Sequence, residues 1–561
     1  MGLSLAVADA RDREAIYRLR HDVYALEIHQ HPANAEARLA DDLDGWNTYL
    51  VARDGDEIAG FVSLTPPGSP KFSIDKYFSR SSLPFAVDAR TYEVRLLTVL
   101  PKYRGRPLAF LLMYGVLRWV EARGGGLIAA IGRREVLPMY AESGLQGTGM
   151  QVASGDVTYE LMFSTTDTLR AAATRLSPFV DRIERTVTWA LPIPFHRPAA
   201  CFHGGAFFDA IGTDLRTLDR ATGIINADVL DAWFDPAPSV LDALREHLPW
   251  LVKTSPPTSC DGLIRVISEA RGVGVDNILV GAGSSDLIFR ALPRWLDRRS
   301  RVLLLDPTYG EYAHVLEQVI GCRVDRLALS RADGYTVPLD TLAEALTRDY
   351  DLVVLVNPNS PTGQYSTAAE LKPLLRAAPP RTRIWVDETY VNYVDGAESL
   401  EAFAAASENV IVCKSMSKMY ALSGARAAYL CASPHHLEEL RAVTPPWVVS
   451  LPAQVAAVRA LEALPYYQAR WTETHALRRG LAEGLRGLQW DVVDGVANFL
   501  LCHLPDSAPT AADVVARCRT RGLFLRDASP MGRMLGDRAV RIAVKDGATN
   551  ARMLEIIEAA T

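Results

Sequence analysis

The sequence predicts an α/β protein in which a small α+β unit precedes a larger unit built on a mostly parallel or mixed sheet. Between residues 277 and 430, apolar runs typical of buried strands alternate with helical patterns, which indicates a sheet with helices on both faces. The first 165 residues instead place short strand-like runs around one long amphipathic helix. A proline-rich break at 191–198 separates the two patterns.

Hydrophobic spacing predicts the elements of the first unit in order. Apolar residues recur at helical spacing in 10–24, and the runs at 48–51 and 58–64 read as strands joined by a turn. The remaining predicted elements are a strand at 92–100, a loop at 101–107, a long helix ending near Gly126, a short helix at 137–145 and a strand at 157–163.

The chain then divides further by composition. We predict an N-terminal domain at 1–165 and a linker at 166–200, with helical patterns in its first part. An ordered arm and a large domain would occupy 201–440. Closing helices and a small α+β C-terminal domain would occupy 441–561.

Length and charge restrict the class of protein. The 561 residues suit two or three domains at about 150 residues each, and 49% hydrophobic residues provide ample core. A net charge of -6 leaves no basic excess, so we do not expect a nucleic acid partner. No apolar run approaches the roughly 20 residues that span a bilayer, so we expect no membrane partner. Seven scattered cysteines without a C-x-x-C pair, and a start unlike a signal peptide, predict a cytoplasmic protein with reduced thiols and no metal site.

Two short segments carry the residues that pyridoxal phosphate (PLP) requires. A lysine amine can hold the cofactor aldehyde as a Schiff base and then move protons, and Lys418 in Ser415-Met416-Ser417-Lys418 is our candidate. Asp387 ends an apolar run and could keep the pyridine nitrogen protonated. Tyr390, three residues later, could donate to the cofactor 3-oxygen and lower the Schiff-base pKa. Each residue alone is weak evidence, so the prediction depends on their combination.

Other residues suit the phosphate, the ring and the 3-oxygen. Hydroxyls at Ser415 and Ser417 and the guanidinium of Arg426 fit a phosphate dianion. A second phosphate-binding candidate is a turn that follows an apolar run and opens a helix, with Gly283, Ser284 and Ser285. Tyr309 follows a strand and could stack on the pyridine, or it could simply fill a turn. The turn after the strand 352–356 offers Asn359 and Ser360 to the cofactor oxygen.

These segments resemble fold-type I PLP enzymes of aminotransferase class I/II, most closely the histidinol-phosphate aminotransferase branch. The resemblance covers roughly 225–560. It implies a large α/β/α sandwich domain with a small α+β domain, a small-molecule amino substrate bound by Arg541 and Asn498, and a homodimer with the active site at the interface. Arg541 would bind the substrate α-carboxylate, for which a guanidinium is well suited.

Two positions depart from the family pattern. The family has Asn where this chain has Ser360, so either Asn359 or Ser360 could contact the cofactor. Relatives also present a tyrosine to the partner subunit's phosphate. The corresponding segment of this chain, 254–259, contains no tyrosine. Both departures lie near the substrate, so the resemblance does not transfer substrate identity.

The first 165 residues resemble the GCN5-related N-acyltransferase (GNAT) fold. The loop that binds acyl-CoA pyrophosphate matches Arg104-Gly105-Arg106-Pro107-Leu108-Ala109, except that proline replaces the middle glycine and removes an N–H donor. The resemblance implies acyl-CoA binding, with Glu93 as general base and Tyr140 as acid. The alternative is a degenerate domain kept for packing, dimerisation or substrate shielding.

Three functions remain open from the sequence. The first is a PLP-dependent aminotransferase in a specialised biosynthetic pathway, acting on an amino acid or related amine through external aldimine and quinonoid intermediates, with acyl transfer by the first domain. The second is a PLP-dependent lyase or a carbon–carbon bond-forming synthase that uses S-adenosylmethionine, with a non-catalytic GNAT-like domain. The third, a catalytically idle scaffold, is disfavoured by the presence of Lys418, Asp387 and Arg541.

Overall fold

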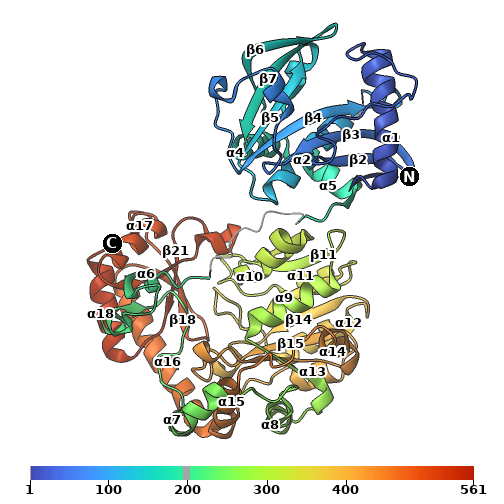
Figure 1. Cartoon of the computed structure of the whole chain (residues 1–561). Coiled ribbons are helices and arrows are strands. Elements are labelled where there is room, and N and C mark those ends of the chain that lie inside the picture. The colour runs from blue at the N-terminus through green and yellow to red at the C-terminus, as the bar shows by residue number, and fades with distance from the viewer. Residues whose placement is uncertain (1, 106, 194–202) are drawn as a thin grey trace. The chain divides into compact units, whose positions relative to one another are not determined.

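The computed structural model describes residues 2–105, 107–193 and 203–561. Contacts divide the chain into two compact units, Met1–Pro198 and Ala199–Thr561 (Figure 1). Both units combine helices with sheets, which confirms the predicted α/β class. Within the described residues, no helix combines the length and the apolar character needed to cross a membrane.

One eight-stranded sheet organises the first unit, in the order β6-β7-β5-β4-β3-β2-β1-β8. Its strands are β1 (Leu3–Val7), β2 (Thr48–Asp54), β3 (Glu57–Thr65), β4 (Thr91–Val99), β5 (Leu127–Arg133), β6 (Gln146–Ser154), β7 (Val157–Thr165) and β8 (Thr188–Ala190). Its helices are α1 (Ala10–Arg20), α2 (Leu108–Glu121), α3 (Leu137–Glu142), α4 (Thr166–Arg175) and α5 (Ser177–Thr186). The apolar helix α2 packs against β2, β3 and β4, so it carries the core of this unit.

Part of the predicted linker belongs to the first unit. Residues 166–190 form α4, α5 and β8, and β8 pairs in parallel with β1 at the edge of the sheet. Leu169 of α4 and Ile183 of α5 are buried in the core that includes α2. The first unit therefore continues past Ala190, since Leu191 is also buried in that core.

The central strands of the first unit separate part-way along their length. β4 pairs in parallel with β5 only from Thr91 to Val94. Just beyond, Leu96 has a φ of +54°, and the register between β3 and β4 shifts opposite this point. A residue in the left-handed region bends a strand away from its neighbour. The two strands therefore diverge and leave space between them.

A seven-stranded sheet forms the centre of the second unit, in the order β10-β16-β15-β14-β13-β11-β12. Its strands are β10 (Ile278–Gly281), β11 (Arg301–Asp306), β12 (Arg323–Ala328), β13 (Leu352–Val356), β14 (Arg383–Asp387), β15 (Val410–Ser415) and β16 (Ala428–Cys431). The strands from β12 to β15 are parallel, whereas β16 pairs antiparallel with both β15 and β10.

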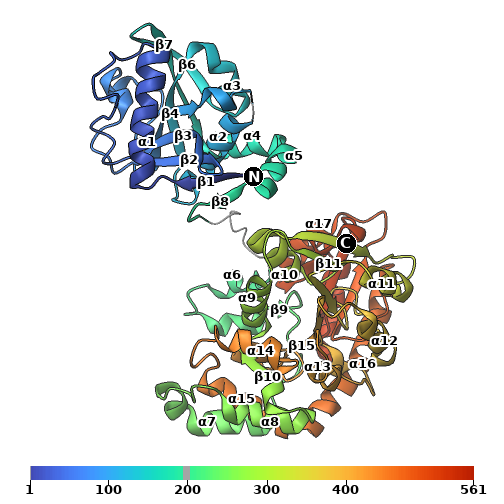
Figure 2. The same ribbon diagram turned by 90° about the vertical axis from the view of Figure 1, so that its right-hand side faces the viewer.

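Helices cover both faces of this sheet (Figures 1 and 2). Alternate residues of β11 enter two different cores: Leu303 and Leu305 pack on one face, and Val302 and Leu304 on the other. The helices of the large domain are α7 (Pro238–Lys253), α8 (Asp261–Arg271), α9 (Ser284–Trp295), α10 (Gly310–Ala313), α11 (Leu339–Leu346), α12 (Ala368–Ala377), α13 (Glu401–Ala405), α14 (Pro434–Arg441) and α15 (Leu451–Glu462). The arrangement explains why the strands read as nearly continuous apolar runs.

The C-terminal part forms a smaller four-stranded sheet in the order β17-β18-β21-β20. Its elements are α16 (Leu464–Gly487), β17 (Asp491–Val493), β18 (Phe499–His503), α17 (Ala511–Arg519), β19 (Leu523–Phe524), β20 (Arg526–Asp527), β21 (Ala539–Ala543) and α18 (Gly547–Glu558). The arm upstream of α7 contains α6 (Phe207–Ile211) and β9 (Ile225–Asn226). Because β9 pairs in parallel with β19, the arm is tied to this C-terminal part.

Candidate active site

A cavity of about 290 Å³ lies where the parallel strands of the second unit end. Val356, Asp387 and Ser415, the last residues of β13, β14 and β15, all line it. Polar loops after parallel strands meet at one edge of the sheet, which is the usual place for a ligand in such folds. Eleven of the predicted site residues line the cavity: Ser284, Ser285, Tyr309, Ser360, Asp387, Tyr390, Ser415, Ser417, Lys418, Arg426 and Arg541.

Lys418 follows β15 and projects an amine at the cavity. Its Nζ lies 3.1 Å from Asp231 Oδ1, and its side chain is 18% exposed. Burial lowers the pKa of the Lys418 amine, and the charge of Asp231 partly offsets that effect. An amine with a lowered pKa is more often neutral and can attack an aldehyde.

The Asp387 carboxylate is buried and fixed by hydrogen bonds. Tyr312 Oη donates to Oδ2 at 2.8 Å, while the backbone N–H and hydroxyl of Thr389 donate to Oδ1 at 2.9 and 2.6 Å. Trp385 Nε1 in turn donates to Tyr312 Oη at 2.7 Å. Burial raises the pKa of Asp387, and the donors oppose that rise. A carboxylate held in this way can accept a hydrogen bond from a protonated ring nitrogen and stabilise its charge.

A concave group of donors lies at the start of α9. Gly283 has a φ of +92°, and an added Cβ there would lie 2.7 Å from Arg426 Cζ, so only glycine lets the guanidinium approach. Ser284 and Ser285 follow at the first turn of the helix, where backbone N–H groups have no helical partner. Arg426 Nη1 donates to Ser417 Oγ at 3.4 Å, which joins this group to the loop after β15.

Two tyrosines bring their rings to the cavity. Tyr309 precedes α10 and donates from its hydroxyl to Glu311 Oε2 at 2.7 Å. Tyr390 packs edge-on against Phe499 with a centroid distance of 5.2 Å. Burial raises the pKa of both phenols, so both stay protonated near neutral pH and can donate a hydrogen bond.

Asn359 and Ser360 have different surroundings although they are adjacent. Asn359 is fully buried, its Nδ2 donates to Pro307 O at 3.0 Å and Thr362 Oγ1 at 3.1 Å, and its Oδ1 accepts from Thr308 at 3.0 Å. Ser360 lines the cavity and accepts a 3.2 Å hydrogen bond from Arg541 Nη1. The amide of Asn359 thus holds the turn, and Ser360 is the residue that faces the cavity.

Arg541 reaches the cavity from β21, whereas Asn498 does not line it. Arg541 also donates to Asp228 O at 2.9 Å, and burial lowers the pKa of its guanidinium to about 10. Asn498 is fully buried and donates to Leu230 O at 3.0 Å. The two side chains therefore hold neighbouring carbonyls of the segment that follows β9, and Arg541 alone of the pair is placed to meet a substrate carboxylate.

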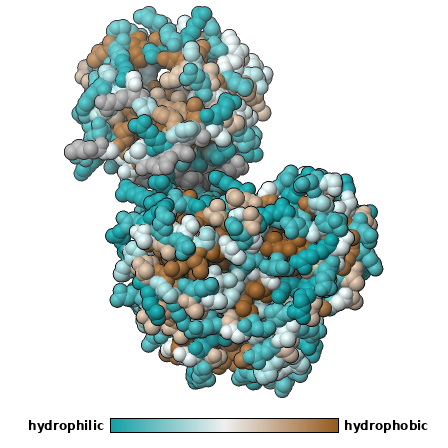
Figure 3. All heavy atoms as spheres, turned by 180° about the vertical axis from the view of Figure 1, so that it is seen from behind, coloured by the Kyte–Doolittle hydropathy of each residue, from teal (hydrophilic) through white to brown (hydrophobic). Residues whose placement is uncertain are grey.

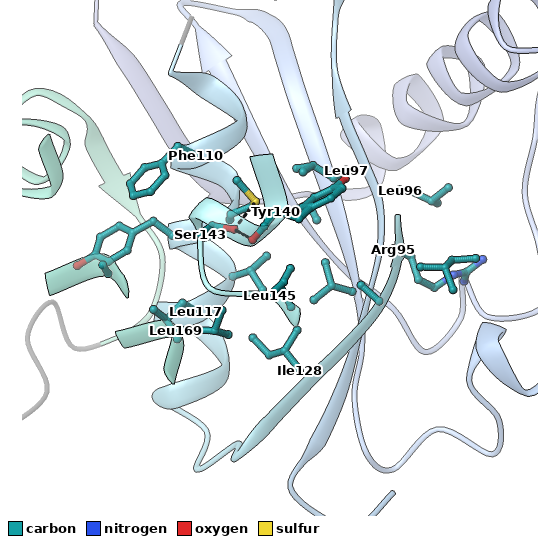
Figure 4. A pocket seen from close by; sticks show the side chains of 18 residues that line it. Arg95, Leu96, Leu97, Phe110, Leu117, Ile128, Tyr140, Ser143, Leu145 and Leu169 are labelled. Carbon is teal, nitrogen blue, oxygen red and sulfur yellow. Dashed lines mark hydrogen bonds between the residues drawn. The ribbon is translucent and has the colours of Figure 1, made fainter. Parts of the chain in front are cut away.

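The first unit has a separate, mainly apolar cavity of about 70 Å³. It lies where β4 and β5 diverge, and α2, α3 and α4 contribute to its walls (Figure 4). Tyr140 of α3 lines it, and burial raises the pKa of the Tyr140 phenol to about 12. Arg95, Leu96 and Leu97 of β4 form one side.

The other predicted residues of this unit have different surroundings. Glu93 is 1% exposed, and its carboxylate accepts hydrogen bonds from Ser73 N, Ser73 Oγ and Ile74 N at 2.6 to 2.9 Å. It caps the turn at 73–76 and does not line the cavity. Arg104 forms a bidentate ion pair with Glu27 at 2.7 and 2.9 Å, and Arg106 lies outside the described residues.

A family model decides how the second unit is classified. The model for aminotransferase class I and II matches residues 260–559, which is more than half of the chain. The chain belongs to the aminotransferase class I and II family. It is a PLP-dependent transferase. The residues around Lys418 fit that cofactor, because an amine, a buried carboxylate and a group of hydrogen-bond donors suited to a phosphate meet in one cavity.

Relatives of this aminotransferase agree with the family. A histidinol-phosphate aminotransferase of Nitrobacter winogradskyi is 29% identical over 52% of this chain and 80% of that protein. An aromatic amino acid aminotransferase of Rhodococcus jostii is 30% identical over 57% of this chain and 85% of that protein. The solved histidinol-phosphate aminotransferase of Sinorhizobium meliloti with pyridoxal-5'-phosphate superposes with a TM-score of 0.57 at 22% identity, over 65% of this chain and 96% of that one, and shows the shared fold.

The first unit of this aminotransferase matches a second family model. The acetyltransferase (GNAT) model covers residues 13–144, which include β4, α2, β5 and most of the residues around the apolar cavity. The prediction that a GNAT-like domain precedes a fold-type I aminotransferase is therefore confirmed.

Sequence reasoning missed several residues of the aminotransferase site. Tyr312 lies three positions after Tyr309, so a regular spacing was available as a signal. Asp231 and Glu311 gave no signal, because an isolated acidic residue is most often solvated. In the structure Glu311 is 1% exposed and accepts from Ser285 Oγ at 3.0 Å.

Proposed function

We propose that this protein is an aminotransferase for a small amino acid or related amine, with Lys418 as the cofactor lysine. The observation that supports this most directly is the convergence of Lys418, Asp387, the α9 donor group and Arg541 on one cavity. When bound, PLP supplies an electron sink for a substrate whose Cα bond breaks.

The chain's own residues would divide the work by position. Lys418 Nζ would hold the cofactor aldehyde and later move a proton at the substrate Cα. Asp387 would keep the ring nitrogen protonated, and Tyr390 would donate to the 3-oxygen. Gly283, Ser284, Ser285, Ser415, Ser417 and Arg426 would hold the phosphate.

Substrate orientation would come from the C-terminal part. Arg541 lies beside Ser360, and its guanidinium can bind a carboxylate with two hydrogen bonds. Asn498 would act indirectly, because it fixes the Leu230 carbonyl. Ser360 replaces a longer amide at this position of the family pattern, so we expect a substrate preference different from that of the histidinol-phosphate enzymes.

A panel of amino acids, phosphorylated amino alcohols and S-adenosylmethionine tests this function. Each compound is mixed with stoichiometric holoenzyme and the products are identified by mass. Amino transfer predicts an oxo acid with the cofactor left as its amine. Turnover that leaves the cofactor as the aldehyde would contradict amino transfer and support the lyase or carbon–carbon bond-forming alternative.

We also propose that the first unit binds an acyl thioester, with the acyl group in the apolar cavity beside Tyr140. The apolar walls and the GNAT match support this. The Glu93 carboxylate accepts hydrogen bonds from Ser73 and Ile74 and does not line the cavity. Tyr140 is therefore the one of the two predicted catalytic residues that lines it. Calorimetric titration of the full chain with acyl-CoA of several chain lengths would show saturable heat, and no heat with any of them would support a degenerate domain.

A homodimer is the third part of the proposal. Several large apolar side chains of the second unit are exposed, and Figure 3 shows apolar patches on its surface. The exposed side chains include Leu248, Trp250, Val252 and Trp447, each at least half exposed. A second copy of this chain could cover them. Sedimentation should give twice the monomer mass, and Trp250→Ser with Trp447→Ser should shift the protein to monomer; a monomeric wild type would contradict the dimer.

A further inference from the structure

We propose that Asp231 is the counter-ion of the cofactor lysine and positions Lys418 Nζ. The inference rests on the proposed role of Lys418 and extends it to a carboxylate 187 residues away in sequence. Its basis is the 3.1 Å contact between Lys418 Nζ and Asp231 Oδ1.

Asp231 is held in place by its own neighbours. Asn226 Nδ2 lies 3.4 Å from Asp231 Oδ2, so each carboxylate oxygen has a separate partner. Asn226 Oδ1 also accepts from Val229 N at 3.1 Å, which closes the turn that carries Asp231. The carboxylate therefore has a partner in its own segment besides Lys418.

The backbone on either side of this turn is anchored as well. Asn498 donates to Leu230 O, the residue before Asp231, and Arg541 donates to Asp228 O. Both contacts come from the C-terminal part of the chain, as does the pairing of β9 with β19. An anchored carboxylate can orient a flexible lysine, because less entropy is lost when one partner is already fixed.

Lys418 has a second polar neighbour on its own loop. Ser423 Oγ lies 3.5 Å from Lys418 Nζ and donates to Ser417 O at 3.2 Å. Asp231 and Ser423 together define one location for the amine at the edge of the cavity. We infer that the free lysine returns to this location whenever the cofactor bond is exchanged, which keeps it close to the reacting atoms.

The other charges that face Lys418 are mostly positive. Arg541 and Arg426 disfavour its ammonium, and Lys545 is a further cation near Asp231. Burial and the charge of Lys418 lower the pKa of Lys545 to about 8, and Asp231 opposes that fall. Tyr390 also lies within electrostatic range of Asp231. Asp231 is therefore the carboxylate that balances a cluster of cations around the lysine.

These charges determine whether each substitution raises or lowers the pKa of Lys418. Removing the carboxylate with Asp231→Asn disfavours the ammonium and lowers the pKa of Lys418, while Lys545→Gln removes a repelling cation and raises it. Asp231→Glu keeps the charge and should stay close to wild type. Asp235→Asn, an exposed acid in the same segment, makes the same charge change and should have no effect.

The test measures the Lys418 amine in the full chain stripped of cofactor. Each variant is labelled with a small amine-reactive reagent over a pH series, and the rate at Lys418 is read by peptide mass. We expect Asp231→Asn to lower the pKa by about one unit, which is a roughly tenfold larger neutral fraction well below the pKa. The pH at which the visible band of the PLP-bound lysine titrates should fall in the same variant.

Each outcome decides the matter. Opposite shifts in Asp231→Asn and Lys545→Gln, with Asp231→Glu unchanged, support the counter-ion. An Asp231→Asn curve that superposes on wild type, or shifts of the same sign in both variants, would overturn it. If Asp231→Asn fails to fold, Lys545→Gln and Asp231→Glu carry the same test. A wild type that binds no PLP at Lys418 would instead overturn the proposed function, so the two failures are distinct.

Discussion

Asn359 and Ser360 lie in one turn, but only Ser360 lines the cavity. The side chain of Asn359 forms hydrogen bonds with Pro307, Thr308 and Thr362, whereas Ser360 faces the cavity beside Arg541. Neighbouring residues in a turn point in different directions, so the sequence alone left both residues as candidates.

The first prediction compares these two residues. Asn359→Ala should destabilise the protein by about 1–3 kcal/mol, because it leaves buried polar partners unpaired. Ser360→Ala should leave the free energy of unfolding nearly unchanged but raise the KM for the amino substrate. Urea unfolding and steady-state kinetics measure the two effects. A large loss of stability in Ser360→Ala, with none in Asn359→Ala, would contradict the assignment.

The residues that sequence reasoning could find are those with neighbours close in the chain. Lys418, Ser415 and Ser417 share one segment, and Asp387 and Tyr390 share another, so their spacing was sufficient. Asp231 could not be assigned in this way, since it meets Lys418 across 187 residues. Tyr312 is near Tyr309 in the sequence, but its contact with Asp387 spans 75 residues. Glu93 had the right position on a strand, but the turn at 73–76 that occupies its carboxylate comes from another segment.

Elements of the second unit fix the positions of the hydrogen-bond donors that we propose bind the phosphate. Gly283 lies between β10 and α9 with a φ of +92°, a conformation that side chains with a Cβ rarely adopt. The strand and the helix were predictable from apolar periodicity. The approach of Arg426 to Gly283 was not, because it depends on the packing of β16 beside β10.

Gly283→Ala is the second prediction. The added methyl would displace the Arg426 guanidinium and strain the turn, so the Kd for PLP should rise by about tenfold or more. Gly262→Ala, within α8 and without any atom near its Cβ position, is the matched control and should bind PLP as wild type does. Equal affinity in Gly283→Ala and wild type would show that this turn does not hold the phosphate.

A buried histidine in β18 gives the third prediction. Burial lowers the pKa of His503 to about 4, and its Nε2 lies 2.9 Å from Tyr335 Oη. Because the folded pKa is below the ordinary value of about 6.5, the neutral form contributes stability above pH 6.5 that is lost as the pH falls towards 4. Between pH 7 and 5 the loss should be about 2 kcal/mol.

Unfolding by urea at pH 7 and pH 5 measures this effect. His503→Gln should lose less stability over that interval than wild type. His247→Gln, which replaces an exposed histidine of α7, should keep the full dependence on pH. An unchanged dependence in His503→Gln would show that other groups cause it.

At the scale of the whole molecule, the two units have separate hydrophobic cores. The cores of Ala199–Thr561 include residues of β15, which precedes Lys418, and the core of Met1–Pro198 includes α2 and residues around the apolar cavity. The general division was visible in the sequence as a change of pattern. The end of the first unit was not visible, because β8 joins the sheet by pairing with β1, which lies at the start of the sequence.

Separate cores predict separate responses to ligand. Scanning calorimetry of the full chain should show two transitions, and PLP at 100 times its Kd should stabilise one of them by about 2.7 kcal/mol. Acyl-CoA should raise the Tm of the other transition only. A single transition, or a shift of both with PLP, would contradict independent units.

The central claim is that Lys418 carries the cofactor, and borohydride reduction tests it most directly. Purified holoenzyme is reduced, digested and mapped by mass, with Lys418→Ala as the control. We predict a reduced pyridoxyl phosphate adduct on the peptide that contains Lys418 and none in the variant. An unmodified Lys418, or an adduct on the neighbouring Lys545, would contradict the claim.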